Sequence, residues 1–228
     1  DRKSTLGLAI YSGFGHRSIS PGEGKWATHY TGSGFNTAIE SGETFNNAAF
    51  GYFDAGTGIL YRYASEEGYM TQNKGLILNA GFAMYHVNRP RYSYLNQEDE
   101  QLSMRASAFV NAEIGIKNTR GAVLPGVYYQ RQGTAQEIFM GAYYRYNLNE
   151  GSKVTGFSKP MSLSVGLFGR VKDAMVAKVM FSLDQYSAGF SYDINISSLT
   201  VVSRARGGFE LFLRYNMGQS NGTNRSRI

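Results

Sequence analysis

Long runs in which apolar and polar residues alternate are the feature that most limits how this chain can fold. The clearest run lies at 103–117, where every second residue from Met104 to Ile116 is apolar, while the intervening residues from Arg105 to Lys117 carry most of the polar groups. A period of two places these two sets on opposite faces of a β-strand. The run is longer than the roughly five or six residues of an ordinary soluble strand, and it suits a strand that crosses a bilayer at a tilt.

The same alternation recurs along the whole chain, and no recurring segment has a convincing helical period. We therefore predict an all-β fold of about ten strands in an antiparallel, up-and-down order. The predicted strands cover 5–17, 48–63, 75–87, 103–117, 120–132, 136–148, 161–170, 173–183, 185–195 and 207–216.

Alternation by itself fits two architectures, because a soluble sandwich and a membrane barrel both have one apolar face on each strand. Three features favour the barrel. The strands are long, aromatic residues gather near their ends, and the polar face mixes both signs of charge with glycine, as a wet or salt-bridged lumen would. No stretch approaches the roughly 20 apolar residues that a membrane helix needs. We predict a transmembrane antiparallel β-barrel, and a soluble glycan-binding sandwich remains the alternative architecture.

The predicted connections differ in length between the two ends of the strands. The long ones fall on one side, at about 18–47, 88–102 and 196–206. Tight turns at Asn118–Thr119 and at Asp184 lie on the other side. Outer-membrane barrels have this asymmetry, with long outer loops and short periplasmic turns. It is imperfect here, because medium connections at 64–74 and 149–160 fall on the predicted periplasmic side.

The sequence contains no constellation typical of catalysis or of a metal or cofactor site. Cysteine is absent, which excludes thiolate metal sites and disulfides. None of the three histidines, His16, His29 and His86, has a second His or a carboxylate at ligand spacing. Glycine pairs such as Gly13 and Gly15 open no helix and lack the Lys-Ser/Thr of a phosphate loop. We predict no enzymatic activity and no catalytic, cofactor-binding or metal-binding residue.

The formal net charge of +6 does not indicate a nucleic-acid partner, because Lys and Arg are spread singly along the chain without a dense basic block. The acidic run Gln97–Glu100 lies in a predicted long loop, where a solvated surface is the favoured interpretation over a cation site. The last residues, 217–228, are polar, so they are predicted to be a flexible tail, with a docking peptide as the alternative.

Several short motifs follow one another in a characteristic order. They are Gly13–Ile19 with Trp26 and Tyr30 after it, Tyr52–Tyr61, Phe82–Pro90, Tyr129–Ile138, Gly141–Tyr146, and an ending that runs from Phe190–Ile194 through Ser197–Leu199 to Gly207–Leu211. In this order and spacing they resemble the PorP/SprF family of outer-membrane proteins of the type IX secretion system, over nearly the whole chain.

The resemblance implies a non-enzymatic barrel of about fourteen strands in the outer membrane of a Gram-negative bacterium. Family members help to bring cargo such as gliding adhesins to the cell surface through a separate translocon. The implied partners are outer-membrane lipid, a secreted cargo with a C-terminal sorting domain, and periplasmic or translocon components. A porin-like channel for small or apolar solutes is the alternative function.

Family members also carry a signal peptide and further residues before the strand that begins near Leu6. The resemblance therefore implies that about four N-terminal strands are missing from this chain. We expect residues 1–216 to belong to the barrel and residues 217–228 to form the tail.

Overall fold

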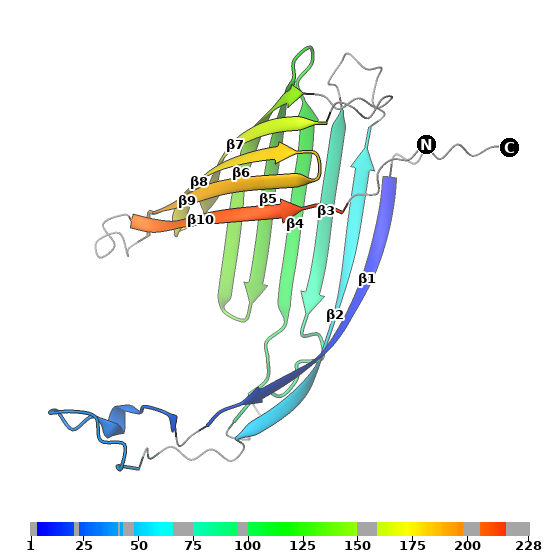
Figure 1. Ribbon diagram of the computed structural model, residues 1–228. Helices are drawn as coiled ribbons and strands as arrows, with labels where there is room; N and C mark the ends of the chain where they lie inside the picture. The colour runs from blue at the N-terminus through cyan, green and yellow to red at the C-terminus, as the bar shows by residue number, and fades with distance from the viewer. Residues whose placement is uncertain are drawn as a thin grey trace.

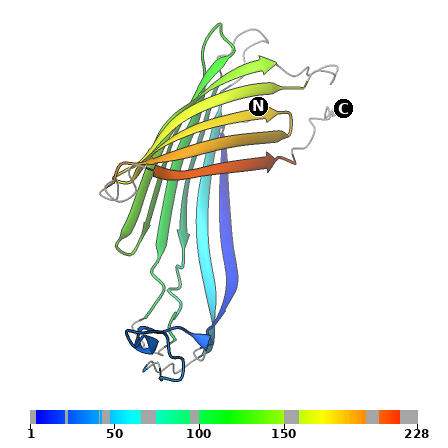
Figure 2. The ribbon, with the colours of Figure 1, turned by 60° about the vertical axis from the view of Figure 1, so that its left-hand side comes forward.

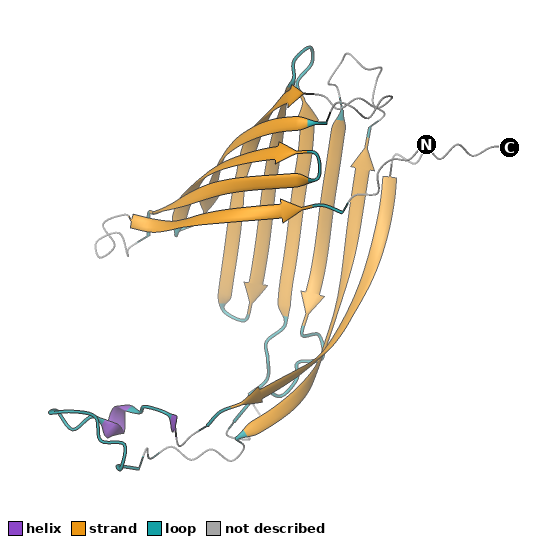
Figure 3. Ribbon diagram, viewed as in Figure 1, coloured by secondary structure: helices purple, strands orange, loops and turns teal. Residues whose placement is uncertain are grey.

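The computed structural model describes residues 4–20, 23–40, 42, 48–65, 75–94, 100–149, 159–197 and 206–217. These residues form one antiparallel sheet of ten strands, in which each strand pairs with the next one along the chain (Figure 1). The strands are β1 (Ser4–Ser18), β2 (Ala49–Ala64), β3 (Leu76–Tyr85), β4 (Arg105–Gly115), β5 (Gly121–Gln132), β6 (Ala135–Asn149), β7 (Met161–Arg170), β8 (Ala174–Leu183), β9 (Tyr186–Asn195) and β10 (Arg206–Tyr215). A 3₁₀ turn, η2 (Ala27–His29), lies in the connection between β1 and β2 (Figure 3).

The all-β, up-and-down fold predicted from the alternation is confirmed. Each predicted strand corresponds to an observed one, and their ends differ by at most two residues. Within the described ranges, no helix is long and apolar enough to cross a membrane.

The two tight turns that the sequence predicted also form. Asn118 and Asp184 have φ angles of 60° and 54°, the left-handed conformation that Asn and Asp adopt more readily than most residues. In the β4–β5 turn the Thr119 hydroxyl donates to the Ile116 carbonyl at 3.0 Å and accepts from the Gly121 N–H at 3.1 Å. These local bonds satisfy the backbone where the chain reverses.

The sheet is strongly curved. β1 to β5 run close to the vertical in Figures 1 and 2, whereas β7 to β10 lie across the view. Glycines on the inner face make close approaches possible. A methyl group at Gly141 would overlap the carbonyl oxygen of Leu167, and one at Gly189 would overlap the ring of Phe212. Missing Cβ atoms at such positions let neighbouring strands and rings close in on the concave side.

Among the described residues β1 pairs only with β2 and β10 pairs only with β9, so the described sheet has two free edges. Apolar side chains of these edge strands are strongly exposed, as in Ile10 at 91% and Leu213 at 79%. The described strands therefore form the wall of an up-and-down barrel that is not closed between β1 and β10. The free edges of β1 and β10 would need hydrogen-bond partners in a membrane, because unpaired strand edges are not tolerated in hydrocarbon.

Candidate functional site

The outer face of the sheet is apolar and uncovered. Leu8, Val110, Val127, Val165 and Leu167 point from it and are between 45% and 80% exposed. An exposed apolar surface spread over the whole sheet is what lipid tails cover in a membrane barrel. A soluble sandwich would bury this face against a second sheet, and the described strands form one sheet only. The structure therefore favours the barrel over the sandwich.

The inner face is polar and more crowded, and it is the candidate functional surface. On β7, β8 and β9 the inner residues Ser164, Val176 and Ser191 are 1%, 3% and 3% exposed. Curvature toward this side brings neighbouring side chains together, so even small residues become buried. Polar groups gathered on a crowded wall need partners, because burying an unpaired charge is costly.

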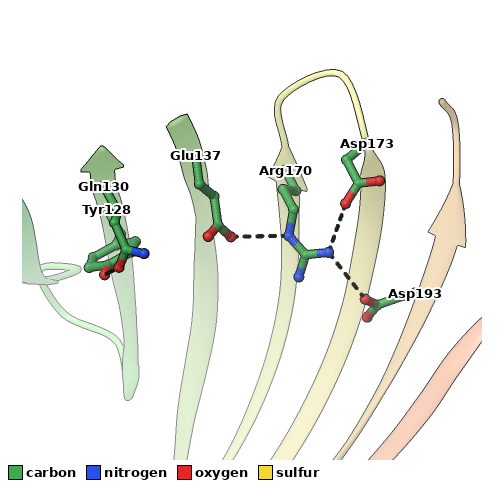
Figure 4. A network of polar contacts seen from close by, with 6 residues as sticks. All are labelled: Tyr128, Gln130, Glu137, Arg170, Asp173 and Asp193. Carbon is green, nitrogen blue, oxygen red and sulfur yellow. Dashed lines mark hydrogen bonds and ion pairs between the residues drawn. The ribbon is translucent and has the colours of Figure 1, made fainter. Parts of the chain in front are cut away.

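Arg170 at the end of β7 is the centre of one polar network on this wall (Figure 4). Its Nε atom donates to Glu137 of β6 at 3.2 Å, and its Nη1 atom lies 2.9 Å from Asp173 in the β7–β8 turn and 4.0 Å from Asp193 of β9. The guanidinium of Arg170 thus links β7 to β6, to β9 and to the β7–β8 turn. Nearby on β5, the hydroxyl of Tyr128 donates to Gln130.

A second ion pair crosses over a strand. Arg145 of β6 makes a two-pronged contact with Glu113 of β4, with one of its bonds at 3.1 Å. β5 lies between these strands, and the residue opposite Arg145 is Ala122, which is 1% exposed. The small side chain of Ala122 leaves room for the guanidinium to reach across. Such paired hydrogen bonds fix both distance and orientation.

A third contact attaches the β3–β4 connection to β2. His86 Nδ1 lies 2.9 Å from Asp54 Oδ1, and Asp54 is only 6% exposed. Asn88 then contacts the β2 backbone twice, donating to the Phe53 carbonyl at 2.7 Å and accepting from the Ala55 N–H at 3.1 Å. The start of this connection is therefore held along the edge of β2 that β3 leaves uncovered.

Aromatic rings extend the same attachment. The rim cluster consists of Arg17, Phe50, Tyr52, Tyr92 and Tyr94. Tyr92 meets Phe50 and Tyr52 edge to face, and Tyr94 meets Phe50 in the same way, with centroids 4.9 to 5.6 Å apart. The Arg17 guanidinium lies 4.8 Å from the Tyr92 centroid. Edge-to-face aromatic pairs are more stabilising than the buried area alone accounts for. The cluster therefore fixes the β3–β4 connection to the end of β1 and the start of β2.

The histidines considered in the sequence analysis occupy three separate environments. His16 lies on β1, His86 pairs with Asp54, and His29 in η2 is 5% exposed and accepts a hydrogen bond from the Trp26 N–H at 3.4 Å. Across the described ranges, no group of three or more His, Cys, Asp or Glu residues is arranged to hold a metal ion.

The acidic run and the C-terminal tail lie largely outside the part of the chain that the structure describes. Residues 97–99 of the acidic run lie outside the described residues, and so do residues 218–228 of the tail.

Sequence reasoning did not find the ion pairs. Alternation assigns Arg145 and Glu113 to the inner face, and the same holds for Arg170, Glu137 and Asp193. Which charge meets which depends on strand order and register, and no spacing within one segment contains that information.

Comparison with known proteins assigns the chain to a family. The family model described as type IX secretion system membrane protein PorP/SprF matches residues 1–215. The searches of curated proteins and of solved structures found no match. The matched range spans every described strand. This chain therefore belongs to the PorP/SprF family of type IX secretion system membrane proteins.

Proposed function

We propose that this protein is a non-enzymatic barrel of the outer membrane that helps to secrete cargo, such as gliding adhesins, or to attach it to the cell surface, through contacts with other proteins. Membership of a secretion-system membrane family is the observation that carries the proposal. The uncovered apolar face supports the place in the membrane. Ion pairs on the inner wall supply a structural role for its charges without catalysis.

The contacts with cargo or translocon are assigned to the side of the long connections. The connection between β3 and β4 is anchored there by Asn88 and by the rim cluster. In the preceding connection, Tyr30 and Phe35 are 58% and 57% exposed, with ring centroids 5.9 Å apart. Aromatic residues are enriched at protein-binding surfaces, so this exposed pair supports the assignment. Periplasmic components of the secretion system are the partners proposed for the opposite side.

Closure of the barrel belongs to the same proposal. The free backbone groups of β1 and β10 need hydrogen-bond partners within the bilayer. We assign these partners to further strands, about four in number, which would give the roughly fourteen-stranded barrel implied by the family. In this arrangement residues 1–216 are part of the barrel and residues 217–228 follow it as a tail.

Deletion and complementation test the function. In a bacterium with a type IX system, deletion of the gene should abolish surface display of a cognate adhesin while the adhesin still accumulates inside the cell. Complementation with the intact gene should restore display. A variant with Tyr30→Ser and Phe35→Ser should insert normally but restore display poorly. Normal display in the deletion strain would contradict the proposal.

The alternative of a porin-like channel has one observation in its favour, the charged inner wall. Single-channel conductance in planar bilayers separates the two functions. We expect no conductance that accounts for solute uptake. A deletion strain that displays adhesins normally but loses uptake of a solute would establish the channel instead.

A further inference from the structure

Some cations on the inner wall are held by aromatic rings instead of carboxylates. Besides Arg17 in the rim cluster, they are Arg105, 4.3 Å from the centroid of Tyr85, Lys178, 5.0 and 5.2 Å from Phe139 and Phe168, and Arg214, 5.9 Å from Phe212. We call Arg105, Lys178 and Arg214 the ring-held cations. In the strand register they share the inner face with the paired residues Glu113, Arg145 and Arg170.

The ring-held cations share the inner face with carboxylates such as Glu210 of β10 but, among the described residues, are not paired with them. Within the described ranges none of the three belongs to an ion pair, in contrast to Arg145 and Arg170 on the same wall. A guanidinium stacked on a ring donates hydrogen bonds in its own plane, so the ring contact leaves its N–H groups available.

The surroundings of Arg105 contain further donors without partners. The Nε atom of Arg105 is buried and has no hydrogen-bond partner. Ser107, the next residue on the same face, is 9% exposed, and its hydroxyl also lacks a partner. Buried polar groups in proteins are nearly always satisfied, so two unsatisfied neighbours need an explanation. The inner wall around Arg105 therefore has hydrogen-bonding capacity that the described residues do not use.

The three cations lie on separate strands, β4, β8 and β10. A single small anion cannot contact all of them, whereas an extended ligand can. Aromatic rings lie on the strands between β4 and β8, beside the ion-paired residues Glu137 and Arg170. Phe139 and Phe168 are stacked with centroids 5.3 Å apart, and Tyr143 meets Phe168 edge to face at 4.8 Å. A ligand that fits this wall alternates acidic groups with apolar ones.

We propose that the inner wall binds an extended acidic peptide segment of a partner protein, with carboxylates on Arg105, Lys178 and Arg214 and apolar side chains on the rings between them. A peptide fits better than a phosphate or a lipid headgroup, because it presents both kinds of group along one chain. The inference deepens the proposed function and rests on it for the identity of the partner as a protein of the secretion system.

The test uses the full chain in a zwitterionic detergent and a fluorescent peptide of about twelve residues that alternates Glu with Phe and Ser. Fluorescence anisotropy should show saturable binding that weakens as salt is added, because salt screens exposed charges. The triple variant Arg105→Gln, Lys178→Met and Arg214→Gln should bind at least tenfold more weakly. The control Arg120→Gln, Arg131→Gln and Lys172→Met removes the same number of charges from exposed positions and should bind like the wild type.

Several results would overturn the inference. One is an equal loss of binding in the two triple variants, and another is an equal affinity for a peptide with Lys in place of Glu. A third is that inorganic phosphate or phosphatidylglycerol micelles displace the peptide as effectively as the unlabelled peptide does. Circular dichroism checks that each variant folds. If the triple variant does not fold, Arg105→Gln and Lys178→Met are measured singly, each with an expected loss of about threefold.

The outcome is separable from that of the proposed function. Peptide binding is measured without cells, and adhesin display is measured without the peptide. A display defect on gene deletion, together with unchanged binding by the triple variant, defeats this inference alone. Peptide binding that depends on the three cations, in a strain that displays adhesins normally after deletion, defeats the proposed function alone.

Discussion

At the scale of single residues, the inner wall depends on charges that reach across strands. Arg145 pairs with Glu113 over an intervening strand, and Arg170 collects carboxylates from β6, β9 and a turn. The side chains of Arg145 and Glu113 are only 23% and 32% exposed, so each would be left poorly solvated by loss of the other. Exposed pairs such as Lys159 and Asp184, 3.6 Å apart, do not have this property.

The replacement Arg145→Met should lower the free energy of unfolding by about 1–3 kcal/mol, because it leaves the half-buried Glu113 carboxylate without its charged hydrogen bonds. Urea unfolding in detergent micelles measures the loss. The double variant with Glu113→Gln should lose less than the two single changes together. Additive losses would show that the pair is not coupled. As a control, Lys159→Met should cost less than about 0.5 kcal/mol.

Two glycines offer a second test at this scale. Gly141→Ala places a methyl group against the Leu167 carbonyl, whereas nothing lies within 4 Å of the position that a methyl group would occupy at Gly169. We expect Gly141→Ala to cost about 1–3 kcal/mol through overpacking and Gly169→Ala to leave stability nearly unchanged. Thermal unfolding followed by circular dichroism distinguishes the two. Equal midpoints would refute the close approach at Gly141.

At the scale of elements, the projecting ends of β1 and β2 are the distinctive feature. β1 and β2 have 15 and 16 residues, whereas β3 has 10. The connection after β3 covers the difference by running along β2, where Asn88 replaces two contacts that a longer β3 would make through its backbone. A connection held in this way presents a defined surface.

Replacing Asn88 with Ala should release the start of the β3–β4 connection. The loss of two hydrogen bonds, each worth about 1 kcal/mol, should make local opening easier and raise the rate of tryptic cleavage after Arg91 about tenfold or more. Mass spectrometry of limited digests locates the cut. Thr119→Ala removes comparable bonds from a turn at the other end of the strands and should not change cleavage here. An unchanged rate in Asn88→Ala would mean that the rim cluster alone holds the connection.

At the scale of the whole molecule, the apolar outer face and the free edges define the environment. Val165 and Leu167 in the middle of β7 are 51% and 65% exposed, and Leu183 at the end of β8 is 40% exposed. Only a hydrocarbon surrounding makes such a face favourable over its full area. The same surroundings require that β1 and β10 find backbone partners.

Arginine substitutions should therefore have effects that depend on depth. Val165→Arg should destabilise the barrel in lipid vesicles by about 2–4 kcal/mol, and Leu183→Arg, nearer the rim, by about 0–1 kcal/mol. Folding yields and unfolding free energies in phosphocholine vesicles give both values. Equal and small costs at the two positions would contradict the membrane-spanning arrangement.

The sequence alone determined the strands, their faces and the family. A period of two is a local property, and it placed Met104 and Val110 on one face and Arg105 and Glu113 on the other without reference to any other strand. The tight turn at Asn118 was likewise predicted from a short local segment. Only the tertiary structure decided that Glu113 meets Arg145 and that Arg105 and Lys178 lie against rings without a carboxylate. Those contacts join residues far apart in the chain, and they depend on strand order, register and curvature, which no single segment encodes.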